Sequence, residues 1–242
     1  VEGLDLERYA AAWRGTIARH DMLRSVVRPD GQMQVLAEVP EFAIPVLDLR
    51  GQEPADVLAA LESRCAELSV QVLRADVWPV FDVRATRMDG DRIRIHVSFD
   101  GLMHDLWSQR LILGEVARRY DDPAAAWPEL TLTFRDYRLA QRACEATPRW
   151  QRAREYWLGR LDALPPPPEL PLARASGTIT RPHFVRRCVR LPQATWSRLV
   201  ERSAKASLTS SGLLLAAFSD VLATWSRVPQ FTLSLTIFDR VP

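Results

Sequence analysis

The chain has 242 residues, of which 47% are hydrophobic and 26% are charged. This composition is typical of a folded globular protein with one large domain or two lobes, and it excludes a largely disordered or fibrous chain. The 32 basic and 30 acidic residues leave a formal charge of only +2, and the basic residues form no block, so we expect no nucleic-acid partner.

Signals for a membrane, a signal peptide or a disulfide framework are absent from the sequence. No apolar stretch approaches the roughly 20 residues that a membrane-spanning helix needs, and the first residues lack the pattern of a signal peptide. We therefore expect a cytoplasmic protein with no membrane partner. Cys65, Cys144 and Cys188 lie far apart and form no CxxC pair, so we expect buried thiols and no metal site.

The first helical pattern covers the N-terminal residues, and Asp5 is placed to cap its start. Its apolar face consists of Leu6, Tyr9, Trp13 and Ile17. Two short extended runs then flank the turn Pro29-Asp30-Gly31, which predicts a β-hairpin.

A second amphipathic helix is predicted over residues 54–69, with a charged face opposite its apolar face. The apolar face consists of Val57, Leu58, Leu61, Cys65 and Leu68.

Residues 80–100 show the clearest pattern, two alternating strands joined by the turn Asp89-Gly90. One face of these strands is apolar and consists of Phe81, Val83, Ala85, Ile93, Ile95, Val97 and Phe99. Because side chains alternate in direction along a strand, His96 and Asp100 project to the opposite, polar face.

A loop from Gly101 to His104 leads from this strand into another predicted helix, for which Asp105 is well placed as the N-cap. The apolar stripe of this helix is expected to run through Leu106, Leu113, Val116 and Tyr120.

The remaining chain divides at a proline-rich segment. A helical segment near 149–163 precedes Leu164–Leu172, which contains too much proline for a helix or a central strand and predicts a stiff connector. Beyond it we expect further elements, namely a strand at 183–191, a helix around Trp196, a longer helix at 210–226 and an alternating strand at 231–238.

Two carboxylates deserve weight as candidate functional groups, because Asp100 ends a strand, Asp105 opens a helix, and both can face a single crevice. A helix N-terminus offers free N–H donors and favours negative charge, so such turns often position reactive groups. The simpler reading is structural, with Asp105 only a helix cap and Asp100 a buried carboxylate paired with an arginine.

At this segment the chain resembles the heterocyclisation domains of nonribosomal peptide synthetases, which are relatives of condensation domains. Asp100, Asp105 and Ser108 fit the DxxxxDxxS signature of those domains, which looks like the replacement for the HHxxxDG motif of ordinary condensation domains. Four other segments resemble family elements in the same order, namely Arg19–Arg24 with Asp30-Gly31-Gln32, Leu164–Leu172, Thr209-Ser210 leading to Leu222–Trp225, and Phe231–Leu235.

The resemblance implies an α+β fold of the chloramphenicol-acetyltransferase type with two lobes. Residues 1–172 would form the N-terminal lobe, and residues 173–242 would form a linker and the beginning of a truncated C-terminal lobe. The active-site tunnel would run between the lobes, so we expect the isolated 242 residues to be inactive. The family's opening element and its downstream Thr and Asp are not found in this sequence.

The resemblance also implies a two-stage reaction on substrates carried by phosphopantetheine arms. The amine of a carrier-bound Cys, Ser or Thr would attack an upstream acyl thioester, and the side chain would then close a thiazoline or oxazoline ring with loss of water. The implied partners are donor and acceptor carrier proteins and neighbouring synthetase domains, and the chain itself would need no metal or diffusible cofactor.

Within this family frame, we expect Asp100 to organise the tunnel through an arginine contact and Asp105 to cap the helix and shape the tunnel floor. Direct proton transfer by either carboxylate is the less favoured role, although burial can move carboxyl pKa values apart so that one accepts and one donates a proton. Ser108 is expected to cap or pack, since no Gly-x-Ser-x-Gly elbow surrounds it. His104 lies one residue from where a catalytic base would be wanted.

Two other functions remain open from the sequence. One is a condensation or acyltransferase domain that forms the amide or ester without closing a ring. The other is a catalytically silent module that docks carrier proteins.

Overall fold

The computed structural model describes residues 1–180, 185 and 187–236. The chain divides into two compact units, Val1–Glu145 and Ala146–Pro242. The expected lobe boundary between residues 172 and 173 concerns the arrangement of a larger fold and stays a prediction.

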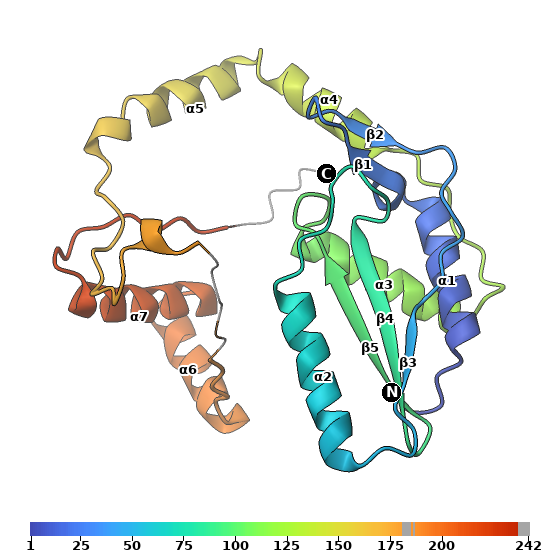
Figure 1. The fold of residues 1–242 in the computed structure, drawn as a ribbon. Helices are drawn as coiled ribbons and strands as arrows, with labels where there is room; N and C mark the ends of the chain where they lie inside the picture. Colours follow the sequence, from blue (N-terminus) through green and yellow to red (C-terminus); the bar gives the residue numbers. More distant parts are fainter. Residues whose placement is uncertain (181–184, 186, 237–242) are drawn as a thin grey trace. The chain divides into compact units, whose positions relative to one another are not determined.

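The first unit is built on a three-stranded sheet in the order β3-β4-β5 (Figure 1). Strand β3 (Val46–Asp48) runs parallel to β4 (Phe81–Met88), and β4 runs antiparallel to β5 (Arg92–Phe99). Phe81 pairs with Phe99 and Met88 pairs with Arg92, so the two predicted strands and their Asp89-Gly90 turn are confirmed.

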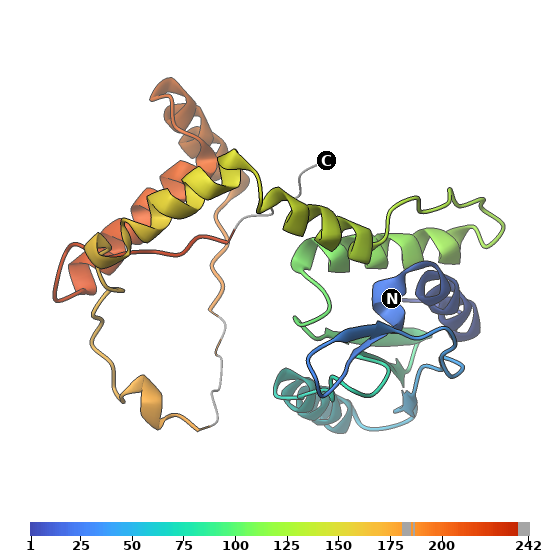
Figure 2. The same cartoon turned by 90° about the horizontal axis from the view of Figure 1, so that it is seen from above.

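Helices cover both sides of this sheet. Helices α1 (Leu6–Arg19) and α3 (Leu106–Asp121) lie on one side, and α2 (Pro54–Ser69) lies on the other (Figure 2). The predicted cap of α1 is confirmed, because Asp5 Oδ1 accepts hydrogen bonds from the backbone N–H of Glu7 at 2.9 Å and of Arg8 at 3.0 Å.

The core lies between the sheet and the pair α1 and α3. Trp13 is fully buried, and its indole stacks on the Phe81 ring with the centroids 5.6 Å apart. The buried residues of this cluster are Ala12, Trp13, Ile17, Leu23, Phe42, Phe81, Val83, Ile112 and Val116. The apolar faces predicted for the first helix and for the two strands therefore meet in one aromatic core.

Helix α3 packs through a stripe that agrees with the predicted one at Val116 and Tyr120 and differs from it at Leu106 and Leu113. Ile112 and Val116 are buried, whereas Leu106 is 62% exposed and Leu113 is 38% exposed. In a helix of 3.6 residues per turn, Ile112 and Val116 lie adjacent on one face, which leaves Leu106 and Leu113 at its exposed edge.

Helix α2 has the predicted bounds but no buried residue. Its half-buried positions include Val57, Leu61, Arg64 and Leu68, whereas Leu58 and Cys65 are exposed. The packed face therefore has an arginine at its middle, and the prediction that Leu58 and Cys65 share that face is wrong. The sheet surface under α2 is polar, so it can accept a guanidinium there.

The predicted hairpin is also present in the first unit. Strands β1 (Ser25–Val27) and β2 (Met33–Val35) pair antiparallel, preceded by a short 3-10 helix, η1 (Asp21–Arg24). Helix α4 (Phe134–Cys144) closes the unit and begins with a capping box formed by Thr133 and Asp136.

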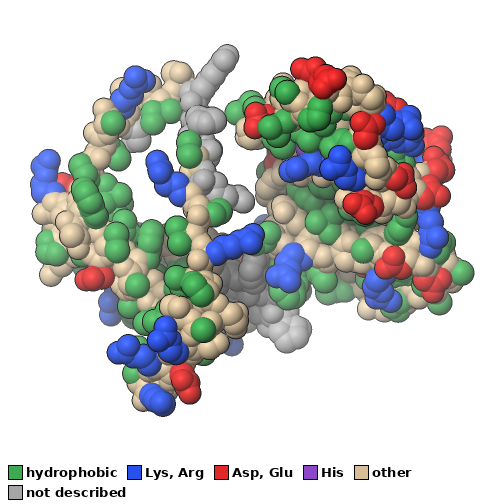
Figure 3. Space-filling view, turned by 90° about the horizontal axis from the view of Figure 1, so that it is seen from below, with side chains coloured by type: hydrophobic (Ala, Val, Ile, Leu, Met, Phe, Trp, Pro, Cys, Tyr) green, Lys and Arg blue, Asp and Glu red, His purple; other side chains and the backbone are tan. Residues whose placement is uncertain are grey.

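The second unit consists of helices and irregular segments in its described part. Its elements are α5 (Pro148–Leu158), η2 (Leu161–Ala163), η3 (Ser176–Thr178), α6 (Gln193–Lys205) and α7 (Ser210–Trp225). The predicted helices are thereby confirmed, and the proline-rich segment forms neither helix nor strand. Many large hydrophobic side chains of the second unit are exposed. On the face of the first unit that Figure 3 shows, acidic and basic side chains are interspersed.

Two predicted strands of the second unit are not formed where the structure describes them. Residues 185, 187–191 and 231–236 are not in strands, and the rest of these two predictions lies outside the described residues. A strand needs a neighbouring strand for its hydrogen bonds, and alternation alone does not supply one. Thr232 instead donates its N–H to the Pro166 carbonyl at 3.0 Å and its hydroxyl to the Pro165 carbonyl at 2.7 Å.

The cysteines and the apolar helices were each the subject of a sequence-based prediction. Cys65, Cys144 and Cys188 are all exposed, so the prediction of buried thiols is wrong. Within the described part of the chain no single helix has the length and apolarity to cross a membrane. Helices α6 and α7 pass that test only as a pair, bent by 99° at the break between them.

Candidate functional site

The loop between β5 and α3 carries the candidate residues. Asp100 follows the last residue of β5, and its Oδ1 accepts a hydrogen bond from the Leu102 N–H at 2.8 Å. Its backbone carbonyl accepts a second bond from the Met103 N–H at 3.2 Å. An aspartate side chain that bonds the backbone two residues on forms an Asx-turn, so Asp100 itself turns the chain out of the sheet.

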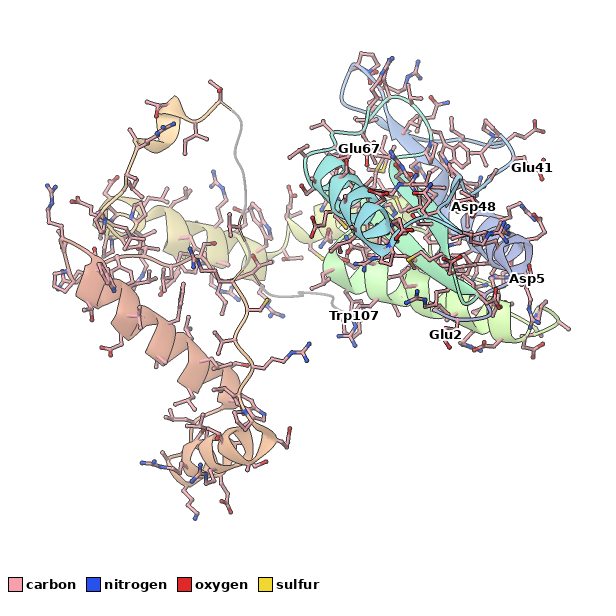
Figure 4. The ribbon with its side chains drawn as sticks, turned by 60° about the horizontal axis from the view of Figure 1, so that its bottom comes forward. Glu2, Asp5, Glu41, Asp48, Glu67 and Trp107 are labelled. Carbon is pink, nitrogen blue, oxygen red and sulfur yellow. The ribbon has the colours of Figure 1, made fainter. Side chains whose placement is uncertain are left out.

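Asp105 begins α3 as predicted. Its backbone is extended, and its Oδ1 accepts a hydrogen bond from the Ser108 N–H at 2.7 Å. This bond satisfies one of the free N–H groups of the first helical turn, and the negative charge is stabilised by the helix N-terminus. Trp107 lies in the same turn and is 45% exposed (Figure 4).

Asp100 does not make the expected arginine contact. In residues 1–180, 185 and 187–236, no ion pair to Asp100 is formed, and its carboxylate serves the local turn instead. Local bonding satisfies the carboxylate without a distant partner, because Asp100 is only half-buried and remains accessible to water.

The middle of the loop is anchored in the core. Met103 is 6% exposed and packs in a small cluster with Val26 and Val80. His104 is 5% exposed, and its ring centroid lies 5.1 Å from that of Phe99. These two buried side chains hold the segment between the carboxylates against the sheet.

His104 is the residue to which sequence reasoning gave too little weight. Burial lowers the pKa of its imidazole, and the nearby Asp100 and Asp105 only partly oppose this effect. The position directly before a helix cap often packs against the fourth helical residue, but that residue is Gln109 here, so no local pattern indicated the burial of His104.

The three motif residues lie in one short segment from the end of β5 to the first turn of α3, but in different surroundings. Asp105 is exposed, whereas Asp100 and Ser108 are half-buried. Chemically, the loop offers carboxylate oxygens that substrate or water can reach, one of them engaged in capping a helix. Where the chain is described, no three His, Cys, Asp or Glu side chains gather in a way that could hold a metal ion.

Comparison with known proteins places this loop in a family. The family model described as "Condensation domain" matches residues 1–241. The chain is 37% identical over 238 residues to pyochelin synthetase PchF of Pseudomonas aeruginosa, and 36% identical over 241 residues to phenyloxazoline synthase MbtB of Mycobacterium tuberculosis. Each alignment covers 98% of this chain but only 13% of PchF and 17% of MbtB.

Solved structures give the same assignment. The cyclization-docking bidomain of the nonribosomal peptide synthetase EpoB from Sorangium cellulosum superposes with a TM-score of 0.86 at 35% identity. The match covers 95% of this chain and 46% of that chain. The mixed helix and sheet content agrees with the two-lobed condensation fold, so the predicted α+β class is confirmed. The chain belongs to the condensation-domain family.

Proposed function

We propose that this chain supports heterocyclisation in a peptide synthetase. The observation that supports this proposal most is the pair of carboxylates in the turn from β5 to α3. It occurs in a chain that is 36–37% identical to a pyochelin synthetase and a phenyloxazoline synthase. The substrates would be an acyl donor and a Cys, Ser or Thr acceptor, each held as a thioester on the phosphopantetheine arm of a carrier protein. The arm belongs to the substrates, and no residue of this chain is assigned to hold it.

The proposed reaction balances in two steps. The acceptor amine attacks the donor thioester, so that a C–N bond forms, the C–S bond breaks and the donor carrier leaves as its free thiol. The acceptor side chain then attacks the new amide carbonyl carbon and gives up its proton. The carbonyl oxygen leaves as water, taking up that proton and the amide N–H proton, as the C–O bond breaks and the ring C=N bond forms. The second step needs a group that removes a proton from the nucleophile and a group that gives a proton to the leaving oxygen.

The contacts of the loop support different roles for its two carboxylates. Asp105 Oδ1 is engaged by the Ser108 N–H, so we assign Asp105 to hold the start of α3 in place. Ser108 takes part through its backbone and is given no nucleophilic role. Asp100 likewise accepts one backbone N–H, from Leu102 through Oδ1, but it is half-buried where Asp105 is exposed, so Asp100 is less open to bulk water and is the better candidate for proton exchange with substrate.

Isosteric amides separate these roles. Asparagine can still cap a helix and form an Asx-turn, so both Asp100→Asn and Asp105→Asn should fold. We expect Asp100→Asn to reduce turnover strongly and Asp105→Asn to reduce it only a few-fold, whereas Asp105→Ala should also lose about 0.5–2 kcal/mol of stability. Equal losses in the two asparagine variants would contradict the division of roles.

Intact mass spectrometry of the acceptor carrier tests the function itself. The native protein that contains residues 1–242 is incubated with a loaded donor carrier and with acceptor carriers bearing Cys, Ser or Thr. The proposal predicts addition of the acyl group followed by loss of one water, with the productive acceptor identifying the nucleophile. Addition without water loss would indicate a condensation domain, and carrier binding without transfer would indicate a docking module.

A further inference from the structure

His104 lies inside the candidate loop but is not part of the family signature. Its side chain is 5% exposed, and neither Nδ1 nor Nε2 makes a well-aligned hydrogen bond among the residues that the structure describes; the Asp100 backbone is the nearest polar group that acts on the ring. Burying polar nitrogens without partners costs free energy that an apolar side chain of similar size would not incur. Packing alone is therefore an incomplete account of a histidine at this position.

The surroundings of the ring connect the loop to the core. The imidazole centroid lies 5.1 Å from the Phe99 ring and 6.5 Å from the Phe81 ring, which meets it edge-on at 90°. Phe81 in turn stacks on Trp13 of α1 at 5.6 Å. His104 is therefore the point at which the segment between Asp100 and Asp105 contacts the aromatic core.

We propose that His104 is a positioning residue whose imidazole, packed against Phe99 and Phe81, fixes the loop that presents Asp100 and Asp105. The anchoring itself follows from the contacts of the ring. Its consequence for turnover rests on the proposed function, because only there do the two carboxylates act on substrate.

Protonation opposes this anchoring. The charged groups that act on the ring are Asp100 and Asp105, both in its own loop, while the packed strands β4 and β5 present Phe81 and Phe99 to it. Burial lowers the pKa of His104, whereas an unfolded histidine binds its proton near about pH 6.5. The state in which the His104 imidazole is exposed to water therefore binds more protons. The state in which the imidazole is buried against Phe99 and Phe81 accordingly loses stability as pH falls below that value.

Hydrogen exchange in the folded protein tests the anchor without any substrate. The reporters are the amides of Leu102, Met103 and Ser108, whose hydrogen bonds define the loop. With intrinsic exchange rates corrected for, we expect their protection to fall several-fold between about pH 7.5 and about pH 5.5, across the histidine range. In His104→Leu this pH-dependent fall should be absent.

His96 provides the matched control, because it is a second buried histidine outside the loop. It is 8% exposed on β5, and burial together with Arg64, Arg94 and Arg84 lowers its pKa. His96→Gln should leave the pH dependence of loop protection as in the wild type. The proposal is overturned if wild-type protection is equal at both pH values, or if His104→Leu shows the same fall as the wild type.

Turnover supplies the second readout. The ratio of the rate at about pH 7.5 to that at about pH 5.5 should be smaller for His104→Leu than for the wild type, whatever the absolute rates, and unchanged for His96→Gln. An equal ratio in His104→Leu would contradict a positioning role. If the wild type turns over no acceptor, the proposed function fails while the exchange experiment still decides the anchor. If His104→Leu does not fold, wild-type exchange alone decides it.

Discussion

The two faces of the β3-β4-β5 sheet are covered by helices in physically different ways. Toward α1 and α3, the sheet presents Phe81 and Val83, both nearly fully buried, and Trp13 of α1 stacks on Phe81. Toward α2, it presents Asp82, Arg84 and other polar side chains. The first face is stabilised by removing apolar surface from water, which is non-directional, and the second by oriented polar contacts.

The α2 face is a polar network. Arg64 Nη1 donates to the Ala85 carbonyl at 3.0 Å and to the Thr86 hydroxyl at 2.9 Å. Arg84 pairs with Asp82 at 2.7 Å and with Glu67 at 2.8 Å. Glu67 lies on α2 (Figure 4). Because the site loop is anchored on the aromatic face through His104, we infer that the frame of the site depends on that face and little on α2.

The largest expected effect follows from removing the central side chain of the aromatic face, by which we mean the side of the sheet that α1 and α3 cover. Trp13→Ala should destabilise the first unit by about 3–5 kcal/mol, because the fully buried indole leaves a cavity that rigid neighbours cannot fill. Urea denaturation followed by circular dichroism measures the change. The control, Leu58→Ala on exposed α2 surface, should change stability by about 0.5 kcal/mol or less. Similar losses in the two variants would remove the distinction between the faces.

A smaller loss is expected from the middle of the polar face. Arg64→Met keeps much of the aliphatic stem but removes both donors to β4, and should cost about 1–2 kcal/mol. Hydrogen exchange should accelerate in α2 while the amides of α1 and α3 keep their protection. Faster exchange in α3 would show that the α2 face also supports the site.

Acid should weaken the polar face selectively. Burial alone would raise the pKa of Asp82, but hydrogen bonds from Arg84 and Gln71 outweigh it and lower the pKa. An unfolded aspartate titrates near about pH 3.9, so this stabilisation is present above that value and is lost as pH falls below it. The stability difference between wild type and Asp82→Asn should therefore shrink on acidification below about pH 4. A constant difference in urea titrations at two pH values would exclude this contribution.

The smallest effect is expected at the outer edge of the network. Glu67 is 60% exposed in its ion pair with Arg84, so Glu67→Gln should cost about 0.5 kcal/mol or less. High salt should reduce the difference further, because exposed pairs are screened. A loss in the free energy of unfolding as large as that of Arg64→Met would show that the Glu67–Arg84 ion pair behaves as a buried one.

Local patterns were sufficient to predict the elements that pack on the aromatic face. Alternation located β4 and β5, apolar spacing located α1, and the side chain of Asp105 marked the start of α3. Each of these features is decided by residues close in sequence. The loop position of Asp100 and Asp105 followed from the same reasoning.

Features decided by tertiary contacts were not predicted. The polar strand face was recognised, but nothing local indicated that α2 would cover it with Arg64 at the centre of the contact. The contact face of α3 is turned toward Ile112 because its partner is α1, and Asp100 bonds Leu102 instead of an arginine. The burial of His104 likewise depends on Phe99 and Phe81, which the chain brings together only on folding.

The central claim is ring closure through the amide carbonyl, and a heavy oxygen isotope in the carbonyl of the donor thioester tests it most directly. The account predicts an acyl-transfer product that loses one water together with the label, since the former carbonyl oxygen departs. With a Ser or Thr acceptor, water loss with the label retained would mean that the side chain lost its own oxygen by elimination. That result, or transfer with no water lost, would contradict heterocyclisation.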